Sequence, residues 1–106
     1  MGATYINSPI VLAQNVDVVI LMLGYPKDVE DMLLHPESGV LKHMKRGSFV
    51  IDHTTSSPGL AERIAKEARS LGIGSIDAPV SGGDVGAKAG KLVTMIGGQV
   101  QDLEAT

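Results

Sequence analysis

The sequence predicts an α/β fold in which helices cover a mostly parallel sheet. Short apolar runs alternate along the chain with amphipathic stretches, which is the pattern of repeated strand–helix units. The first apolar run, from Val18 to Leu23, is apolar at every position and is typical of a strand buried on both faces. The 106 residues contain no linker-like stretch, so we expect one domain.

Helix starts and glycine breaks divide the chain into elements. Ser8-Pro9 and Ser57-Pro58 each join a capping serine to a proline, a pair that favours the first turn of a helix. After the second pair, Leu60 and Ile64 lie on one helix face, and Gly72 closes the helix. The predicted elements are helices over 9–14, 27–34, 40–45 and 58–71, strands over 18–23, 48–52, 73–78 and 91–96, and a helix-like polar tail at 99–106.

The composition argues against several classes of protein. Nine lysines and arginines against twelve acidic residues give a net charge of −3, whereas a nucleic-acid-binding domain normally carries a basic patch. The apolar run at 18–23 is far shorter than the roughly 20 residues that cross a bilayer. No histidine pair has the spacing of a zinc site. We expect no nucleic acid, membrane or metal partner, and the absence of cysteine fits an intracellular protein of the cytoplasm or mitochondrion.

Small, hydroxyl and glycine residues follow three of the predicted strands. In an open parallel sheet, ligands bind at the carboxyl ends of the strands, so these segments are the places where a ligand site is expected. The three segments are Leu23-Gly24-Tyr25-Pro26, Asp52-His53-Thr54-Thr55-Ser56 and Asp77-Ala78-Pro79-Val80-Ser81-Gly82-Gly83.

The last of these segments has two interpretations. Successive backbone N–H groups in Ser81-Gly82-Gly83 can converge on an anion and form a nest for a carboxylate or phosphate. The same residues also suit a flexible turn after a strand, because glycine clusters commonly mark turns. Composition alone does not decide between them.

The motifs taken together resemble the β-hydroxyacid dehydrogenase family, which includes 3-hydroxyisobutyrate dehydrogenase and has a 6-phosphogluconate dehydrogenase-like NAD-binding domain. The resemblance rests on Ser8-Pro9, 18–23, 51–58, Ser81-Gly82-Gly83 and 90–98, in the family's order and spacing. It implies a Rossmann-like, doubly wound domain that binds NAD or NADP. It also implies an oxidoreductase whose substrate is a small β-hydroxy acid or its semialdehyde.

The resemblance also implies roles for individual residues. Leu23 and Gly24 match the loop that runs along the dinucleotide, and Asp28 matches a polar cofactor contact. Thr55 matches a threonine on the nicotinamide side of the cofactor. The turn that holds the substrate carboxylate is matched by Ser81, Gly82 and Gly83.

Two features of the family do not occur in this sequence. No Gly-x-Gly-x-x-Gly turn is present to receive the pyrophosphate, and neither Lys88 nor Lys91 matches the motif of the family's catalytic lysine. We therefore expect residues 1–106 to be the C-terminal part of a dinucleotide-binding domain. This internal piece would lack the first βαβ unit, the helical substrate and dimerisation domain, and any catalytic residue, so it would be inactive alone. Its uncovered sheet edge favours a homo-oligomer.

Two other functions stay open on the sequence. A relative of the family that has lost catalysis could serve as an oligomerising or interaction scaffold. A doubly wound phospho-acceptor signalling domain also has acids at strand ends, although Asp52 and Asp77 do not form an adjacent pair on one strand.

His53 is a further candidate, since it follows the strand at 48–52 and could reach a ligand. The resemblance assigns no catalysis to this position. His35 and His43 lie in settings where solvated side chains are expected.

Overall fold

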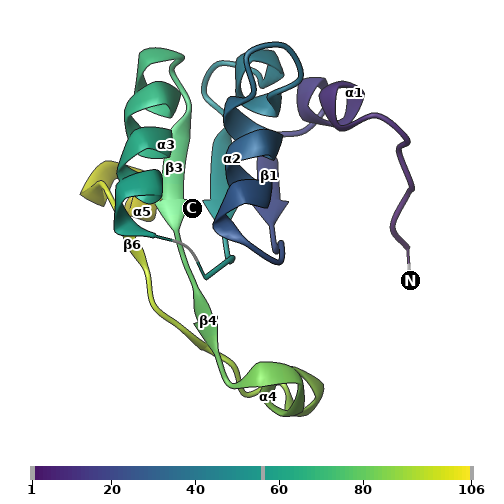
Figure 1. The fold of residues 1–106 in the computed structure, drawn as a ribbon, viewed down its shortest axis with the longest axis vertical. Helices are drawn as coiled ribbons and strands as arrows, with labels where there is room; N and C mark the ends of the chain where they lie inside the picture. Colours follow the sequence, from purple (N-terminus) through teal and green to yellow (C-terminus); the bar gives the residue numbers. More distant parts are fainter. Residues whose placement is uncertain (1, 56, 106) are drawn as a thin grey trace.

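The computed structural model describes residues 2–55 and 57–105. Its central sheet contains β1 (Val18–Leu21), β2 (Phe49–Asp52), β3 (Gly74–Asp77) and β6 (Gly97–Gly98), in the order β1-β2-β3-β6. The first three strands are parallel and β6 is antiparallel to β3 (Figure 1). This arrangement confirms the predicted α/β fold with a mostly parallel sheet.

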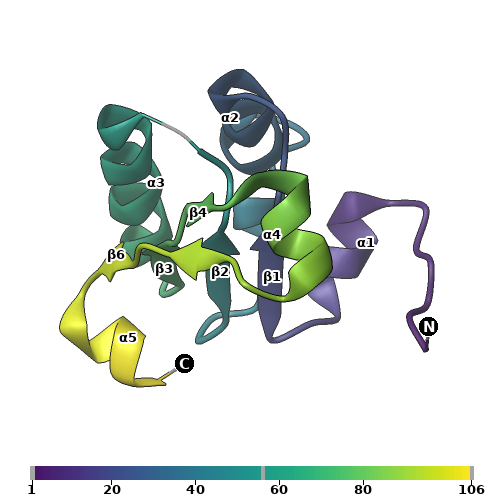
Figure 2. The ribbon, with the colours of Figure 1, turned by 90° about the horizontal axis from the view of Figure 1, so that it is seen from below.

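Helices cover the two faces of the sheet unequally. Helices α2 (Pro26–Leu34) and α3 (Pro58–Ser70) lie on one face, while α5 (Val100–Ala105) lies on the other face, against β3 (Figure 2). The short α1 (Pro9–Gln14) and the 3₁₀ helix η1 (Val40–His43) pack together beside α2. The core lies between the sheet and these helices, and its largest fully buried apolar side chains are Val29, Leu33, Leu41 and Val50.

Local sequence signals explain where the helices begin. The Ser57 hydroxyl accepts a hydrogen bond from the Leu60 amide at 3.2 Å, and Ser8 caps α1 in the same way through the Val11 amide at 3.3 Å. Each serine is followed by a proline at the first helical position, as predicted. In α3 the buried positions recur at helical spacing and face the sheet; they are Leu60, Ile64 and Ala68.

The expectation that 18–23 forms a strand buried on both faces is wrong. Strand β1 ends at Leu21, and the alternate side chains of Ile20 and Met22 are 63% and 64% exposed. Helix α2 lies over one face of β1, whereas α3 and α5 pack against β3 (Figures 1 and 2). The second face of this strand is therefore uncovered, although its sequence is apolar throughout.

The prediction of a single strand at 91–96 is also wrong. Val93–Thr94 (β5) pairs antiparallel with Val80–Ser81 (β4) in a separate two-stranded sheet, and the chain rejoins the main sheet only at β6. Between β4 and β5 lies a helix that the sequence did not predict, α4 (Gly83–Ala89). We call residues 79–96 the arm, because they extend beyond the carboxyl ends of the main strands (Figure 1).

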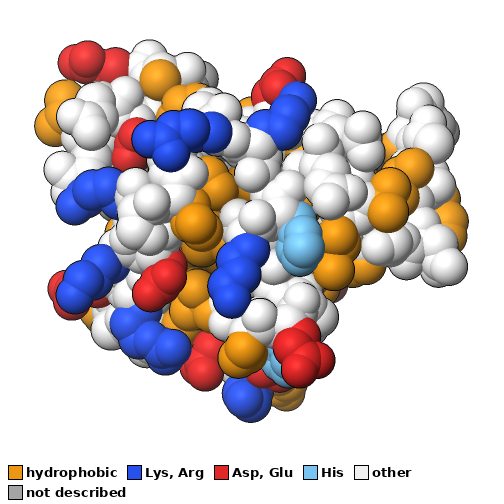
Figure 3. Space-filling model, turned by 90° about the horizontal axis from the view of Figure 1, so that it is seen from above, with side chains coloured by type: hydrophobic (Ala, Val, Ile, Leu, Met, Phe, Trp, Pro, Cys, Tyr) orange, Lys and Arg blue, Asp and Glu red, His pale blue; other side chains and the backbone are white. Residues whose placement is uncertain are grey.

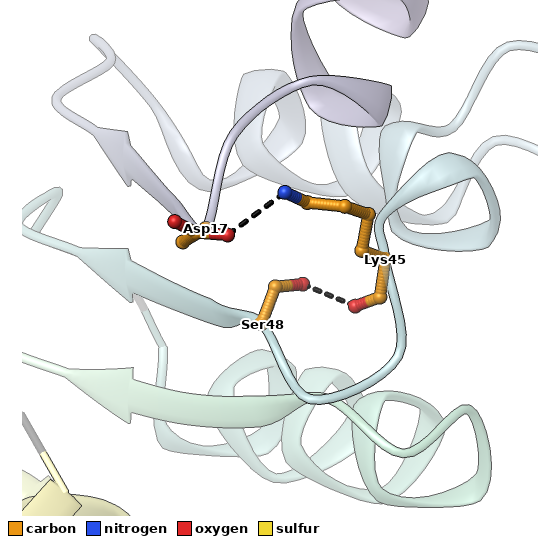
Figure 4. A network of polar contacts seen from close by, with 3 residues as sticks. All are labelled: Asp17, Lys45 and Ser48. Carbon is orange, nitrogen blue, oxygen red and sulfur yellow. Dashed lines mark hydrogen bonds and ion pairs between the residues drawn. The ribbon is translucent and has the colours of Figure 1, made fainter.

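Polar contacts hold the amino ends of β1 and β2 together. The Lys45 ammonium lies 2.8 Å from an Asp17 carboxylate oxygen, and the Ser48 hydroxyl donates to the Lys45 carbonyl (Figure 4). The hydrogen bond and charge of Lys45 lower the pKa of the Asp17 carboxyl below its ordinary value. Viewed from this end of the sheet, positive and negative side chains are interspersed on the surface (Figure 3).

None of the helices within residues 2–55 and 57–105 is long and apolar enough to cross a membrane.

Candidate functional site at the carboxyl edge of the sheet

The parallel register brings three strand ends to the same level of the sheet. Leu21 of β1 pairs with Asp52 of β2, which in turn pairs with Asp77 of β3. The segments that follow these residues therefore leave the sheet side by side at one edge, which Figure 2 shows from below. This edge is where open parallel sheets bind ligands, and it carries the segments that the sequence singled out.

The segment after β2 holds the loop after β1 by two hydrogen bonds. The His53 amide donates to the Leu21 carbonyl at 2.8 Å, and the Leu23 amide donates to the Thr54 hydroxyl at 2.8 Å. Thr54 is 1% exposed, and its own amide donates to the carboxylate of Asp52 at 2.9 Å. A buried threonine thus fixes the backbone of the loop that the resemblance assigns to the cofactor.

The same segment also holds the chain after β3. The Ala78 amide donates to the Asp52 carbonyl, and Nδ1 of His53 donates to the Ala78 carbonyl, each at 2.8 Å. Residues 52–54, which we call the central segment, are therefore bonded to the chain on both sides.

Two of the four predicted cofactor residues line one groove. Leu23 and Asp28 line a cavity of about 510 Å³ between the start of α1 and α2, with Ile10 and Met32 among its apolar walls. Gly24 is exposed beside it, and a side-chain carbon at Gly24 would meet only the Asp28 carboxylate, at 3.6 Å. Thr55 is exposed next to the buried Thr54.

Asp28 has a structural role that the sequence reasoning missed. One of its carboxylate oxygens accepts a hydrogen bond from the Tyr25 amide at 3.1 Å and caps the start of α2. The assignment of Asp28 as a cofactor contact stays a prediction.

Ser81, Gly82 and Gly83 lie on the arm and do not line this groove. All three are exposed, and φ is +129° at Gly82 and +61° at Gly83. These angles are unfavourable for other residues, and a side-chain carbon at Gly82 would lie 3.2 Å from the Leu92 side chain. The turn that begins α4 thus requires glycine at Gly82, and its role as the carboxylate-binding turn stays a prediction.

The two residues that join the segments are not those to which the resemblance gives a role in binding. Thr54 was named only as part of its segment, and His53 was given no role by the resemblance. The sequence holds a signal for Thr54, because strand alternation places Val50, Asp52 and Thr54 on one face. In the structure all three are buried. No comparable signal exists for the hydrogen bond of His53, since it depends on where β3 ends.

Two carboxyl groups interact at this edge. Partial burial, together with the negative charge of Asp52, raises the pKa of the Asp77 carboxyl above its ordinary value.

Among residues 2–55 and 57–105 no group of three or more metal-ligating side chains gathers here or elsewhere.

A parallel sheet with candidate ligand-binding segments gathered at the carboxyl ends of its strands is the arrangement found in cofactor-binding α/β domains. A family model described as the NAD binding domain of 6-phosphogluconate dehydrogenase matches residues 1–106. The chain belongs to this family, and the prediction of NAD or NADP as its cofactor is confirmed at this level.

Relatives of known class share most of the chain. It is 52% identical over 98 residues to a probable 3-hydroxyisobutyrate dehydrogenase-like protein of Arabidopsis thaliana, covering 92% of this chain and 29% of that protein. It is 41% identical over 103 residues to an NAD-dependent L-serine dehydrogenase of Pseudomonas aeruginosa, covering 97% and 34%. The resemblance to β-hydroxyacid dehydrogenases is therefore confirmed.

Solved structures agree with this assignment. The Mycobacterium tuberculosis 3-hydroxyisobutyrate dehydrogenase with L-serine has a TM-score of 0.83 at 33% identity, covering 94% of this chain and 33% of that chain. Psf3 in complex with NADP⁺ and 2-OPP has a TM-score of 0.89 at 28% identity, covering 98% and 37%. The chain spans about a third of the length of these relatives.

We predict that Thr54→Val lowers the free energy of unfolding by about 1–3 kcal/mol, because it leaves the Leu23 amide without its acceptor. Valine keeps the shape of threonine, so the loss reports the hydrogen bond rather than a cavity. Thr55→Val, at the exposed neighbouring position, should change stability by less than about 0.5 kcal/mol. Urea unfolding of the two variants measures both values, and equal stabilities would contradict the role of Thr54.

We predict that Asp77→Asn stabilises the chain at neutral pH. Since the folded state raises the pKa of Asp77, ionising this carboxyl costs the folded state more than the unfolded state. The cost is present above the folded pKa and disappears as the pH falls through it, so the advantage of Asn should shrink in acid. Urea unfolding measured from neutral pH into acid tests the prediction. Glu37→Gln, at an exposed position, is the control for the loss of one negative charge. A stabilisation that grows in acid would contradict it.

Proposed function

We propose that the protein containing this chain is an NAD(P)-dependent oxidoreductase of a small β-hydroxy acid or its semialdehyde. The proposal rests on the hydrogen bonds of the central segment at the carboxyl ends of the strands. It is bonded on one side to the loop at Leu23–Gly24, which we call the cofactor loop, and on the other side to Ala78, where the arm begins. The relatives named 3-hydroxyisobutyrate dehydrogenase and L-serine dehydrogenase support this substrate class.

The residues at this edge fit one side of a dinucleotide. The groove beside Leu23 has apolar walls that can contact a ring, and the Asp28 carboxylate on its lining can accept hydrogen bonds from ribose hydroxyls. Exposed Gly24 allows close approach, and Thr55, which the resemblance assigns to the nicotinamide side, is exposed and accessible to a ligand. When bound, the nicotinamide cofactor supplies the hydride chemistry.

The arm would bind the other reactant. In this proposal the Ser81 hydroxyl and the backbone amides at Gly82 and Gly83 hold the substrate carboxylate, which is a charge-assisted arrangement. Holding the carboxylate orients the hydroxyl-bearing carbon against the cofactor, and such positioning lowers the barrier of a two-substrate reaction. The proton acceptor is not among the residues assigned here, so the chain by itself should give no turnover.

A chimera tests the proposal. This chain would replace the matching third of the M. tuberculosis 3-hydroxyisobutyrate dehydrogenase, and reduction of NAD⁺ or NADP⁺ would be followed with 3-hydroxyisobutyrate and with L-serine. We predict an active chimera, in which Ser81→Ala lowers kcat/KM for the acid about 10- to 100-fold, the effect of one charge-assisted hydrogen bond. The KM for the cofactor should change little.

The controls separate a wrong function from a failed chimera. Ser70→Ala, in the last turn of α3, should leave kcat/KM unchanged. Circular dichroism and thermal unfolding establish that each protein is folded. A folded chimera without activity on either acid, or an equal loss from Ser70→Ala and Ser81→Ala, would overturn the proposal.

A further inference from the structure

A buried carbonyl marks the point where the arm leaves the sheet. Ala78 is 2% exposed, and its amide makes the last hydrogen bond of the β2–β3 ladder, to the Asp52 carbonyl at 2.8 Å. The next residue, Pro79, has no N–H group, and from there the chain continues beyond the end of the sheet into β4 (Figure 1). The Ala78 carbonyl therefore needs a donor from outside the ladder, because an unpaired buried carbonyl is costly.

The side chain of His53 supplies that donor. Its Nδ1 lies 2.8 Å from the Ala78 carbonyl oxygen, and the imidazole is half-buried. A carbonyl oxygen can only accept, so Nδ1 must carry a proton, and in the neutral ring Nε2 is left as an acceptor. The hydrogen bond thus fixes both the ring and its tautomer.

Among the residues that the structure describes, few hydrogen bonds join the arm to the rest of the chain. Beyond Ala78, the Pro79 carbonyl accepts from the Met95 amide at 2.9 Å, and Val80–Ser81 pairs with Val93–Thr94. These bonds hold the arm together internally but do not set its direction relative to the sheet. On the β4 side, the direction depends on Ala78, which is bonded through its amide to Asp52 and through its carbonyl to His53.

We propose that His53 is a positioning residue that sets the direction of the arm, and with it the place of Ser81–Gly83 relative to the cofactor loop. The backbone of His53 is itself fixed, because its amide donates to the Leu21 carbonyl and its neighbour Thr54 accepts from the Leu23 amide. The functional part of this inference rests on the proposed function, since it takes Ser81–Gly83 as the substrate-binding turn. The hydrogen bond and its effect on the direction of the arm do not rest on the proposed function.

Three substitutions separate this role from general packing. His53→Asn keeps a donor at the position of Nδ1, since the asparagine amide nitrogen is the same number of bonds from the backbone. His53→Gln moves the donor to the position of Nε2, and His53→Leu removes it. If the donor at Nδ1 is what matters, Asn alone should rescue the arm.

The first test is nuclear magnetic resonance on the ¹⁵N-labelled 106-residue chain without ligand. At alkaline pH, where a histidine ring is neutral, His53 should show a protonated Nδ1 and an unprotonated Nε2. His53→Leu and His53→Gln should speed hydrogen exchange of the Ala78 and Met95 amides by about five- to tenfold, and His53→Asn should not. The Gly86 amide, bonded within α4 to Gly82, is the internal control.

A neutral ring protonated at Nε2, or equal exchange in the Asn, Gln and Leu variants, would overturn the proposal.

The second test uses the active chimera. His53→Leu should raise KM for the acid about tenfold or more while leaving the KM for the cofactor within about twofold. His53→Asn should have KM values close to those of the wild type. An equal rise in both KM values would show that His53 does not act through the arm. An inactive chimera would count against the proposed function, whereas the exchange results on the chain would still decide the role of the hydrogen bond.

Discussion

The structure depends on one short stretch of backbone and side chain, the central segment at residues 52–54. Parallel pairing brings the ends of β1, β2 and β3 to one level, and the middle strand is the only one of the three that borders both others. After β2 ends, its chain continues to bond both neighbours, through the His53 amide to Leu21 and through the His53 ring to Ala78. The proposed cofactor loop and the arm are thus both hydrogen-bonded to the same segment, residues 52–54.

This support matters most for the arm. The arm extends beyond the sheet, and none of the residues in α4 is buried. The loop at Leu23–Gly24 is followed by α2, whose start is capped by the Asp28 carboxylate. If the chain acts as proposed, the distance between cofactor and substrate affects the rate, and a hydrogen-bonded segment between the two loops would keep that distance constant.

Much of the fold could be predicted from the sequence, for identifiable physical reasons. The caps at Ser8 and Ser57 and the periodicity of α3 are local, and they predicted these helices well. The exposed face of β1 could not be predicted, because an apolar run does not reveal whether a helix packs on its second side. The helix α4 was missed because Gly82 and Gly83 are typical of turns, and here the turn starts a helix.

The candidate site divides in the same way. The resemblance drew attention to Leu23, Thr55 and the Ser81–Gly83 turn, because these motifs are contiguous in the sequence. It gave no role to His53 and did not single out Thr54. The hydrogen bond of the His53 ring joins residues 25 positions apart in the sequence, and that of the Thr54 hydroxyl joins residues 31 positions apart. Such contacts depend on strand register and on where Pro79 ends the ladder, and neither is visible in a local motif.

Binding of the nicotinamide cofactor at the carboxyl ends of the strands can be measured by an amide-shift titration of the ¹⁵N-labelled chain with NAD⁺ and NADP⁺. We expect the amides of Leu23, Gly24 and Thr55 to shift with increasing cofactor. Gly47 and Gly72, whose backbones are bonded to each other at the opposite end of the sheet, should not shift. Shifts confined to that opposite end, or to the outer faces of α2 and α3, would contradict this expectation.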